Sequence, residues 1–291
     1  MISPGVCDLG PVKLHYLQAG VGDLVLCLHG FPDHAPSMRP LLEEVAAAGY
    51  RAVAPFMRGY APSTTEARTF ESAALAGDVL GLGDSLASGT DMMVVGHDWG
   101  AVAALHAAVL QPERVTRLVT LGMPHARAFA RALREDPVQQ RRSWYQFLFL
   151  AEGFAERVVA DRDFAFVERL IAEWSPRSPF GPEEWLALRR TLASRGTLTA
   201  AMRYYRSAFG AEPRDPILAR DAARWDEPVR VPTLAIYGER DGCIGPEVHA
   251  SQAEHFTGDL RLRSAPGVGH WPHLEDPRRV IPEIVSFLRA A

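Results

Sequence analysis

The segment DMMVVGHDWGAVAALHAAVL, residues 91–110, runs from an apolar stretch through two glycines into an alanine-rich stretch. This pattern predicts a buried strand, a tight bend and a helix, with Asp98 at the bend between Gly96 and Gly100. Flanking glycines let a strand and a helix approach closely and push the central side chain outward, as in a nucleophile elbow. Asp98 is therefore a candidate nucleophile, although an aspartate more commonly caps the following helix.

Similar alternations of apolar and amphipathic segments surround this unit and predict the rest of an α/β sheet. The strands are apolar throughout rather than alternating, which is typical of a parallel sheet covered on both faces. The expected strands are residues 23–30, 51–57, 91–98, 115–124, 232–241 and 260–270, and the expected helices are residues 40–50, 70–89, 100–110 and 281–291.

The strand pattern disappears between residues 126 and 225, where the sequence predicts helices only. The expected helices are residues 143–160, 164–174, 181–194, with Pro182 near its start, and 198–209. We therefore expect a core of residues 1–125 and 226–291 and a helical cap, residues 126–225, inserted after the sequence TLGMP. Below, residues 126–225 are called the cap segment.

The composition excludes several classes of protein. The chain has 291 residues, of which 47% are hydrophobic and 23% charged, and 31 basic and 35 acidic residues give a net charge of -4. Mixed charges of this kind predict no nucleic-acid partner and no membrane partner. The sequence offers no spanning apolar run and no signal-peptide pattern, so a cytoplasmic protein is expected. Its cysteines, Cys7, Cys27 and Cys243, are expected to be free thiols.

Two further segments give Asp98 partners for catalysis. Asp241 follows the strand in YGERDGCIG, and His270 lies in the glycine-flanked loop PGVGHWPHLEDP. The order nucleophile, acid, histidine is the chain order of the α/β-hydrolase triad. Taken singly, Asp241 would more often be a turn residue and His270 a surface or packing histidine. The early segment LCLHGFPDH then suggests the amides of Phe31 and Trp99 as the donors of an oxyanion hole.

The segments HGFPD, GHDWGA, GERD and GHWPHLEDP together resemble the epoxide hydrolases of the α/β-hydrolase fold. This resemblance implies two lid tyrosines, one in a Tyr-Gln and one in a Tyr-Arg segment. SWYQFLF and MRYYRSAF offer Tyr145 and Tyr205, while Tyr204 is expected to pack. Core packing would otherwise be the ordinary role of all three side chains. The chain departs from the family at Phe56, where an aspartate is commoner.

An aspartate in place of the usual serine indicates displacement at an sp3 carbon. A carboxylate can attack an epoxide carbon from behind, and the resulting ester is then hydrolysed by water that His270 and Asp241 activate. Tyr145 and Tyr205 would donate to the poor leaving oxygen. We therefore expect an epoxide hydrolase that forms a vicinal diol. A haloalkane dehalogenase with the same nucleophile and a silent ligand receptor on this fold are the alternatives.

The expected partners are water and a small lipophilic epoxide in contact with Trp99, Trp144, Phe147 and Phe31. No cofactor and no metal are expected, because His97 next to the nucleophile should point away from the site and a lone His-x-x-His ending at His273 is weak evidence for zinc. The chain is expected to be a monomer or a homodimer, and the sequence leaves the natural epoxide open.

Overall fold

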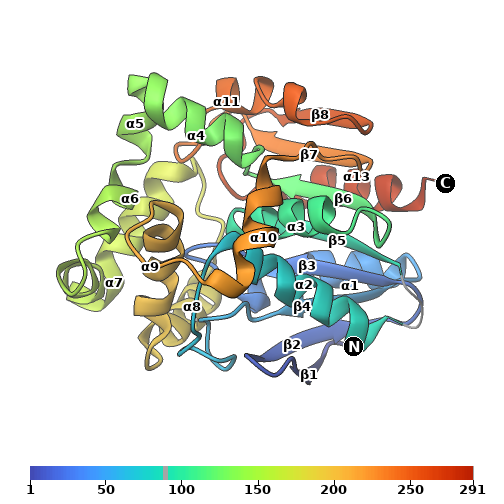
Figure 1. Ribbon diagram of the computed structural model, residues 1–291, viewed down its shortest axis with the longest axis horizontal. Helices are drawn as coiled ribbons and strands as arrows, with labels where there is room; N and C mark the ends of the chain where they lie inside the picture. Colours follow the sequence, from blue (N-terminus) through green and yellow to red (C-terminus); the bar gives the residue numbers. More distant parts are fainter. Residues whose placement is uncertain (88–90, 291) are drawn as a thin grey trace.

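The computed structural model describes residues 1–87 and 91–290. Its centre is an eight-stranded sheet of order β1-β2-β4-β3-β5-β6-β7-β8 (Figure 1). The strands are β1 (Ser3–Asp8), β2 (Lys13–Ala19), β3 (Leu24–Leu28), β4 (Arg51–Pro55), β5 (Met92–His97), β6 (Val115–Leu121), β7 (Thr233–Gly238) and β8 (Leu260–Ala265). The six neighbouring strands β4, β3, β5, β6, β7 and β8 run parallel, whereas β2 is antiparallel to β1 and β4. The predicted, mostly parallel sheet is confirmed.

Helices cover both faces of the sheet, as the apolar strands predict. On one face α1 (Arg39–Ala47) contacts α13 (Pro277–Arg289), and on the other α2 (Ser72–Leu86) contacts α3 (Trp99–Leu110). Each pair buries a separate hydrophobic cluster against the sheet. These helices match the predicted ones, except that residues 88–89 of the helix predicted over 70–89 and residue 291 lie outside the described residues.

Between β6 and β7 the described chain forms helices and loops with one isolated β-bridge, from Val229 to Phe256. The α-helices are α4 (Ala126–Glu135), α5 (Pro137–Arg142), α6 (Trp144–Phe149), α7 (Phe154–Trp174), α8 (Pro182–Ala193), α9 (Thr197–Ala208) and α10 (Ala219–Ala223). Most of these helices gather beyond one end of the sheet, whereas α10 lies over α2 and α3 (Figure 1). Throughout residues 1–87 and 91–290, no helix has both the length and the apolar character required to cross a bilayer.

The single helix predicted over residues 143–160 is wrong. The chain turns after α6 and restarts α7 at Phe154, behind Gly153, which adopts a φ of 73°. A second break lies inside α7, where Arg162, Asp163 and Phe164 all have positive φ. Left-handed backbone is costly for residues other than glycine, but this break lies where the sequence predicts one, between the helices expected over residues 143–160 and 164–174.

Candidate active site

The elbow at Asp98 has the geometry that the sequence predicts. Asp98 lies between β5 and α3 with φ 49° and ψ -118°, a conformation that is strained for a residue with a side chain. A Cβ atom on Gly96 would lie 2.4 Å from the carbonyl oxygen of Gly100, and one on Gly100 would lie 2.4 Å from that of Leu28. Glycine at both positions therefore allows strand and helix to meet and exposes Asp98 at the tip.

Asp98, Asp241 and His270 lie together at the carboxyl end of the sheet. His270 Nδ1 is 2.8 Å from Asp241 Oδ2, and His270 Nε2 is 3.7 Å from Asp98 Oδ2. The other oxygen of Asp241 accepts the amides of Cys243 at 2.7 Å and Ile244 at 3.0 Å. Asp241 is thus fixed by its own loop and orients His270, while the longer distance to Asp98 leaves His270 Nε2 without a hydrogen-bond partner among the described residues.

The charges around His270 favour its protonated form. Burial alone would lower the pKa of this imidazole, but the negative charges of Asp241 and Asp98 and the hydrogen bond with Asp241 outweigh that effect and raise the pKa to about 10. Its surroundings therefore favour the imidazolium form of His270. The Asp98 contribution to this shift depends on Asp98 being charged.

One of the two suggested oxyanion donors is in place. The amide of Phe31 donates to Asp98 Oδ1 at 2.8 Å. This leaves Oδ2 as the oxygen that faces His270 and is free to attack. In the described structure no hydrogen bond joins the Trp99 amide to Asp98, although Trp99 begins α3, where N–H groups have no partner inside the helix. Trp99 as the second donor stays a prediction.

Tyr145 on α6 and Tyr205 on α9 line the same cavity as Asp98 and are fully buried, with ring centroids 5.8 Å apart. The Tyr145 hydroxyl lies 3.4 Å from Cys243 Sγ and accepts from Gln146 Nε2 at 3.1 Å. The Tyr205 hydroxyl has no hydrogen-bond partner among the described residues. Burial, with the nearby charge of Asp98, raises the pKa of both tyrosines, which keeps them protonated.

Neighbouring Tyr204 has a different role. Its hydroxyl donates to the carbonyl oxygen of Arg58 at 2.7 Å, and its ring packs against Phe70 and Trp99. Tyr204 lines the cavity, but its hydroxyl proton is already used in the hydrogen bond to Arg58. Phe56, where the chain departs from the family pattern, packs beside His34 below the site.

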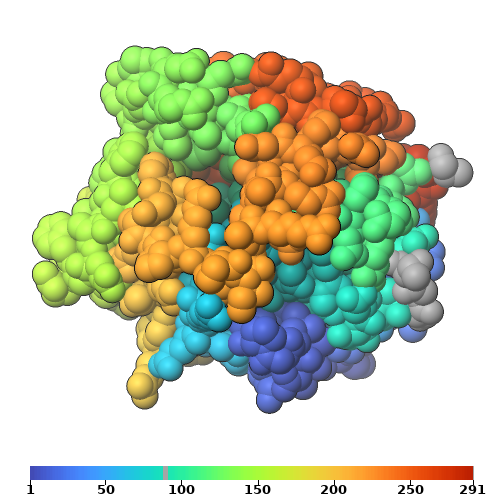
Figure 2. Space-filling model, in the orientation of Figure 1, coloured from blue at the N-terminus to red at the C-terminus, as the bar shows by residue number. Residues whose placement is uncertain are grey.

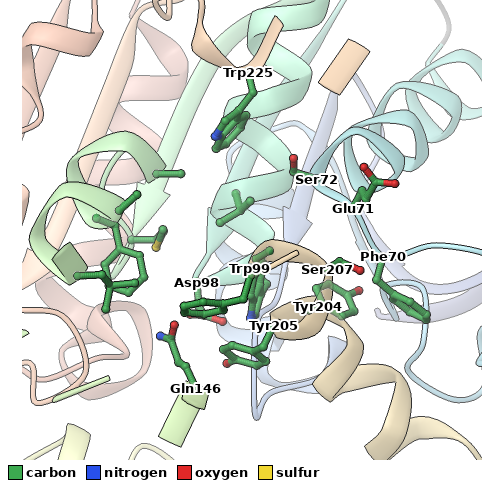
Figure 3. Close-up of a pocket in the computed structure, with 18 of the residues that line it drawn as sticks. Phe70, Glu71, Ser72, Asp98, Trp99, Gln146, Tyr204, Tyr205, Ser207 and Trp225 are labelled. Carbon is green, nitrogen blue, oxygen red and sulfur yellow. The ribbon is translucent and has the colours of Figure 1, made fainter. Parts of the chain in front are cut away.

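The cavity has a volume of about 560 Å³ and lies between the cap segment and the starts of α2 and α3, with the loops that follow β6 and β7. Figure 2 shows the surface hollowed between α4 and the neighbouring α9 and α10. In Figure 3, Asp98, Trp99, Gln146 and Tyr205 gather at one end, and Trp225 lies toward another wall. Apolar side chains dominate the lining, including Val102, Met123, Phe129, Leu133, Phe147 and Phe209.

Two predicted substrate contacts need correction. Trp144 does not line the cavity, because adjacent residues of a helix point about 100° apart and Tyr145 takes the inward position; Trp144 is 39% exposed and packs on Phe166. Phe31 is fully buried behind the cavity wall, where its ring contacts Phe149 and Tyr205. Trp99 and Phe147 do line the cavity.

His97 turns away from the cavity, beneath the elbow. Its Nε2 donates to the carbonyl oxygen of His270 at 2.9 Å, and its Nδ1 is 3.7 Å from Asp33 Oδ2. Among the described residues, the potential metal ligands within 4.8 Å of one another are Asp241, Cys243 and His270. This set excludes His97 and His273, and a metal there would compete with the hydrogen bond between Asp241 and His270.

Sequence reasoning missed Cys243 and Gln146, which both contact the Tyr145 hydroxyl. Cys243 was considered only as one of three scattered thiols. Its position two residues after Asp241 could have indicated that it lies beside the site. Gln146 belongs to the Tyr-Gln segment itself, where only the tyrosine was assigned a role.

The chain is similar to known proteins over most of its length. A model of the α/β hydrolase fold family matches residues 23–277, which include Asp98, Asp241 and His270. The chain is 30% identical to epoxide hydrolase 3 of Xenopus tropicalis over 96% of this chain and 75% of that protein. It is 27% identical to an epoxide hydrolase of Caballeronia sordidicola, over 96% and 91% of the two chains. A solved structure from Klebsiella pneumoniae superposes with a TM-score of 0.88 at 26% identity, covering 99% of this chain and 98% of that one.

Proposed function

The chain belongs to the α/β-hydrolase fold family and within it to the epoxide hydrolases, and from this membership we propose that it converts a lipophilic epoxide to a vicinal diol through an ester on Asp98. The observation that carries the proposal is the position of two protonated tyrosine hydroxyls and a carboxylate on one cavity. An epoxide needs both a nucleophile behind its carbon and a proton donor at its oxygen.

In the first step Asp98 Oδ2 attacks an epoxide carbon while its other oxygen stays on the Phe31 amide. The C–O bond of the ring breaks, and Tyr205 or Tyr145 gives a proton to the leaving oxygen. The developing alkoxide is far more basic than a phenolate, so transfer from a buried tyrosine is favourable. The product is a hydroxyalkyl ester of Asp98.

In the second step His270 removes a proton from a water molecule, which attacks the carboxyl carbon of Asp98. The carbonyl oxygen that becomes negative is the one held by Phe31, so the donor is aimed at the charge before it develops. Asp241 stabilises the imidazolium that forms. Collapse of the intermediate breaks the ester bond, and the departing diol oxygen takes the proton that His270 holds. The carboxylic acid of Asp98 then gives its proton to the tyrosinate left by the first step, which restores the carboxylate and the tyrosine.

Alkylation of Asp98 should make His270 a better base. In the free enzyme the charge of Asp98 helps to raise the pKa of His270 to about 10. The ester is neutral, so this contribution disappears and the pKa falls.

We therefore expect the two steps to respond differently to pH between 6 and 9. Alkylation needs no deprotonated His270 and should keep its rate. Ester hydrolysis should rise with pH, by up to about tenfold per unit below the lowered pKa, because only neutral imidazole can accept the proton. Rapid-quench single-turnover measurements separate the rates, and an alkylation rate that rises with pH while hydrolysis stays flat would contradict this order of events.

A panel of terminal, disubstituted and aryl epoxides, assayed beside bromoalkanes and chloroalkanes, tests the proposed reaction. We expect diol from at least one lipophilic epoxide, and halide release at least about 100-fold slower, because the tyrosine donors match an alkoxide better than a halide. Faster halide release would support the dehalogenase, and tight binding of ligands without any product would support the receptor.

We propose further that residues 126–225 act as a cap over a core of residues 1–125 and 226–291. Both tyrosines belong to the cap segment, whereas Asp98, Asp241 and His270 belong to the core. Closure of the segment over a bound epoxide would bring donor and nucleophile to opposite sides of the ring.

A further inference from the structure

The C-terminal end of α7, residues 173–175, is inserted between the two loops that carry Asp241 and His270. The carbonyl oxygen of Trp174 accepts the amide of Gly242 at 3.1 Å and the amide of His270 at 3.2 Å. The Trp174 ring also packs against the rings of His270 and Tyr145, with distances between ring centroids of 5.4 Å and 4.9 Å. One residue of the cap segment thus contacts the acid loop, the histidine loop and a lid tyrosine.

Two glycines make this close contact possible. A Cβ atom on Gly242 would lie 2.0 Å from the carbonyl oxygen of Glu173. One on Gly269 would lie 2.5 Å from both the Ser175 Cα and the Trp174 oxygen. Since real Cβ atoms do not approach backbone this closely, the backbone of α7 meets the two loops where only glycine fits.

Glu275 binds the backbone of the residues before and after His270. Its Oε2 accepts the amide of Gly269 at 2.9 Å, and its Oε1 accepts the amide of Trp271 at 3.1 Å. The Ser175 hydroxyl donates to the same Oε1 at 2.6 Å, and the Ser175 oxygen in turn accepts from the His270 amide at 3.2 Å. The backbone on both sides of His270, and that of His270 itself, is therefore held by one carboxylate and one hydroxyl.

We propose that Glu275 and Ser175 are positioning residues for His270, which hold its imidazole at the distance from Asp98 that admits the hydrolytic water. Neither side chain touches the reacting atoms. The effect on catalysis rests on the proposed two-step reaction, in which His270 acts only on the ester. Removal of either side chain lets the histidine loop shift, and a displacement of about 1 Å can cost about 100-fold in rate. Alkylation by Asp98 does not use His270 and should be spared.

The test compares Ser175→Ala, Glu275→Gln, Glu275→Ala and their Ser175 double variants with Ser178→Ala. Ser178 is the matched control, because its hydroxyl donates to the carbonyl oxygen of Phe180 on the same segment and does not reach His270. Single-turnover mass spectrometry with styrene oxide gives the rates of ester formation and ester decay. The low-field proton resonance of the His270–Asp241 hydrogen bond, assigned by its loss in His270→Gln, reports the position of His270 without any substrate.

We expect ester decay to slow by about 10-fold in Ser175→Ala and by about 10- to 100-fold in Glu275→Ala. Glu275→Gln should fall between Glu275→Ala and the wild type because its amide keeps one acceptor oxygen, and the Ser175 double variants should be non-additive because the two residues share a hydrogen bond. Ester formation should stay within about twofold, and the resonance should shift or broaden in every variant except Ser178→Ala.

The proposal would be overturned if the Ser175 and Glu275 variants had the same rate of ester decay and the same resonance as Ser178→Ala. It would also be overturned if these variants slowed ester formation as much as ester decay. Ser175→Ala, which removes one oxygen only, keeps the test valid if Glu275→Ala does not fold. If the wild type forms no ester, the proposed function fails, yet a resonance that moves in Ser175→Ala would still establish positioning of His270.

Discussion

The His270→Gln protein is expected to accumulate an ester on Asp98 and to turn over at least about 1,000-fold more slowly than the wild type. The reason is that only the second step needs a base. Oδ2 needs no base to attack, so ester formation should continue, whereas hydrolysis needs a proton acceptor beside the water. Intact-protein mass spectrometry after mixing with excess epoxide should show one adduct of the mass of the substrate.

Two variants control this experiment. Asp98→Ala should show neither adduct nor product, because it removes the attacking oxygen. His273→Gln changes a buried histidine in the short helix α12 (Pro272–Glu275), which follows the His270 loop. The His273 ring has no hydrogen-bond partner among the described residues, and this variant should form and hydrolyse the ester at near wild-type rates. Full turnover by His270→Gln, or an adduct that maps to a residue other than Asp98, would refute the assignment.

The fold was largely predictable because burial of the parallel strands leaves a direct trace in the sequence. Continuous apolar runs identify β3 to β7, and the glycines around Asp98 identify the elbow. The β1–β2 hairpin was missed because neither strand is a continuous apolar run: at the edge of the sheet β1 buries Cys7 alone among its six residues, and β2 mixes buried with partly buried positions. The turn between α6 and α7 was missed for a different reason, since Gly153, with its positive φ, is a single residue inside a long stretch that otherwise suits a helix.

The candidate site was predictable where chain order carries the information. Asp98, Asp241 and His270 follow one another in a known order, and the structure brings them together. The contact of Ser175 with the histidine loop has no comparable signal, because 95 residues separate Ser175 from His270 and no pattern connects them. The prediction that Trp144 contacts the substrate was wrong, because a shift of one residue along a helix decides whether a side chain faces the cavity or the solvent.

Loss of both lid hydroxyls, in the Tyr145→Phe/Tyr205→Phe double variant, is expected to slow alkylation by about 100- to 10,000-fold, the usual contribution of general acid catalysis. Each single variant should keep measurable activity, since the remaining hydroxyl can still stabilise the alkoxide. Tyr205→Phe should lose more than Tyr145→Phe. The Tyr205 hydroxyl has no other partner in the described structure, whereas the Tyr145 hydroxyl is already engaged by Gln146 and Cys243.

The measurement is single-turnover ester formation with a styrene-oxide-like probe, for the wild type, both single variants and the double variant. Tyr204→Phe is the matched control, because it removes a neighbouring buried hydroxyl whose proton goes to the Arg58 carbonyl oxygen, and it should leave alkylation within a few-fold of the wild type. Hydrolysis of the ester, once formed, should be nearly unchanged in all four variants, since the tyrosines act on the leaving oxygen and the ester no longer contains the strained ring. Unchanged alkylation in the double variant would mean that the tyrosines only pack the cap segment. If that variant also released halide from a bromoalkane as fast as the wild type does, the result would support a haloalkane dehalogenase that uses Asp98 as its nucleophile.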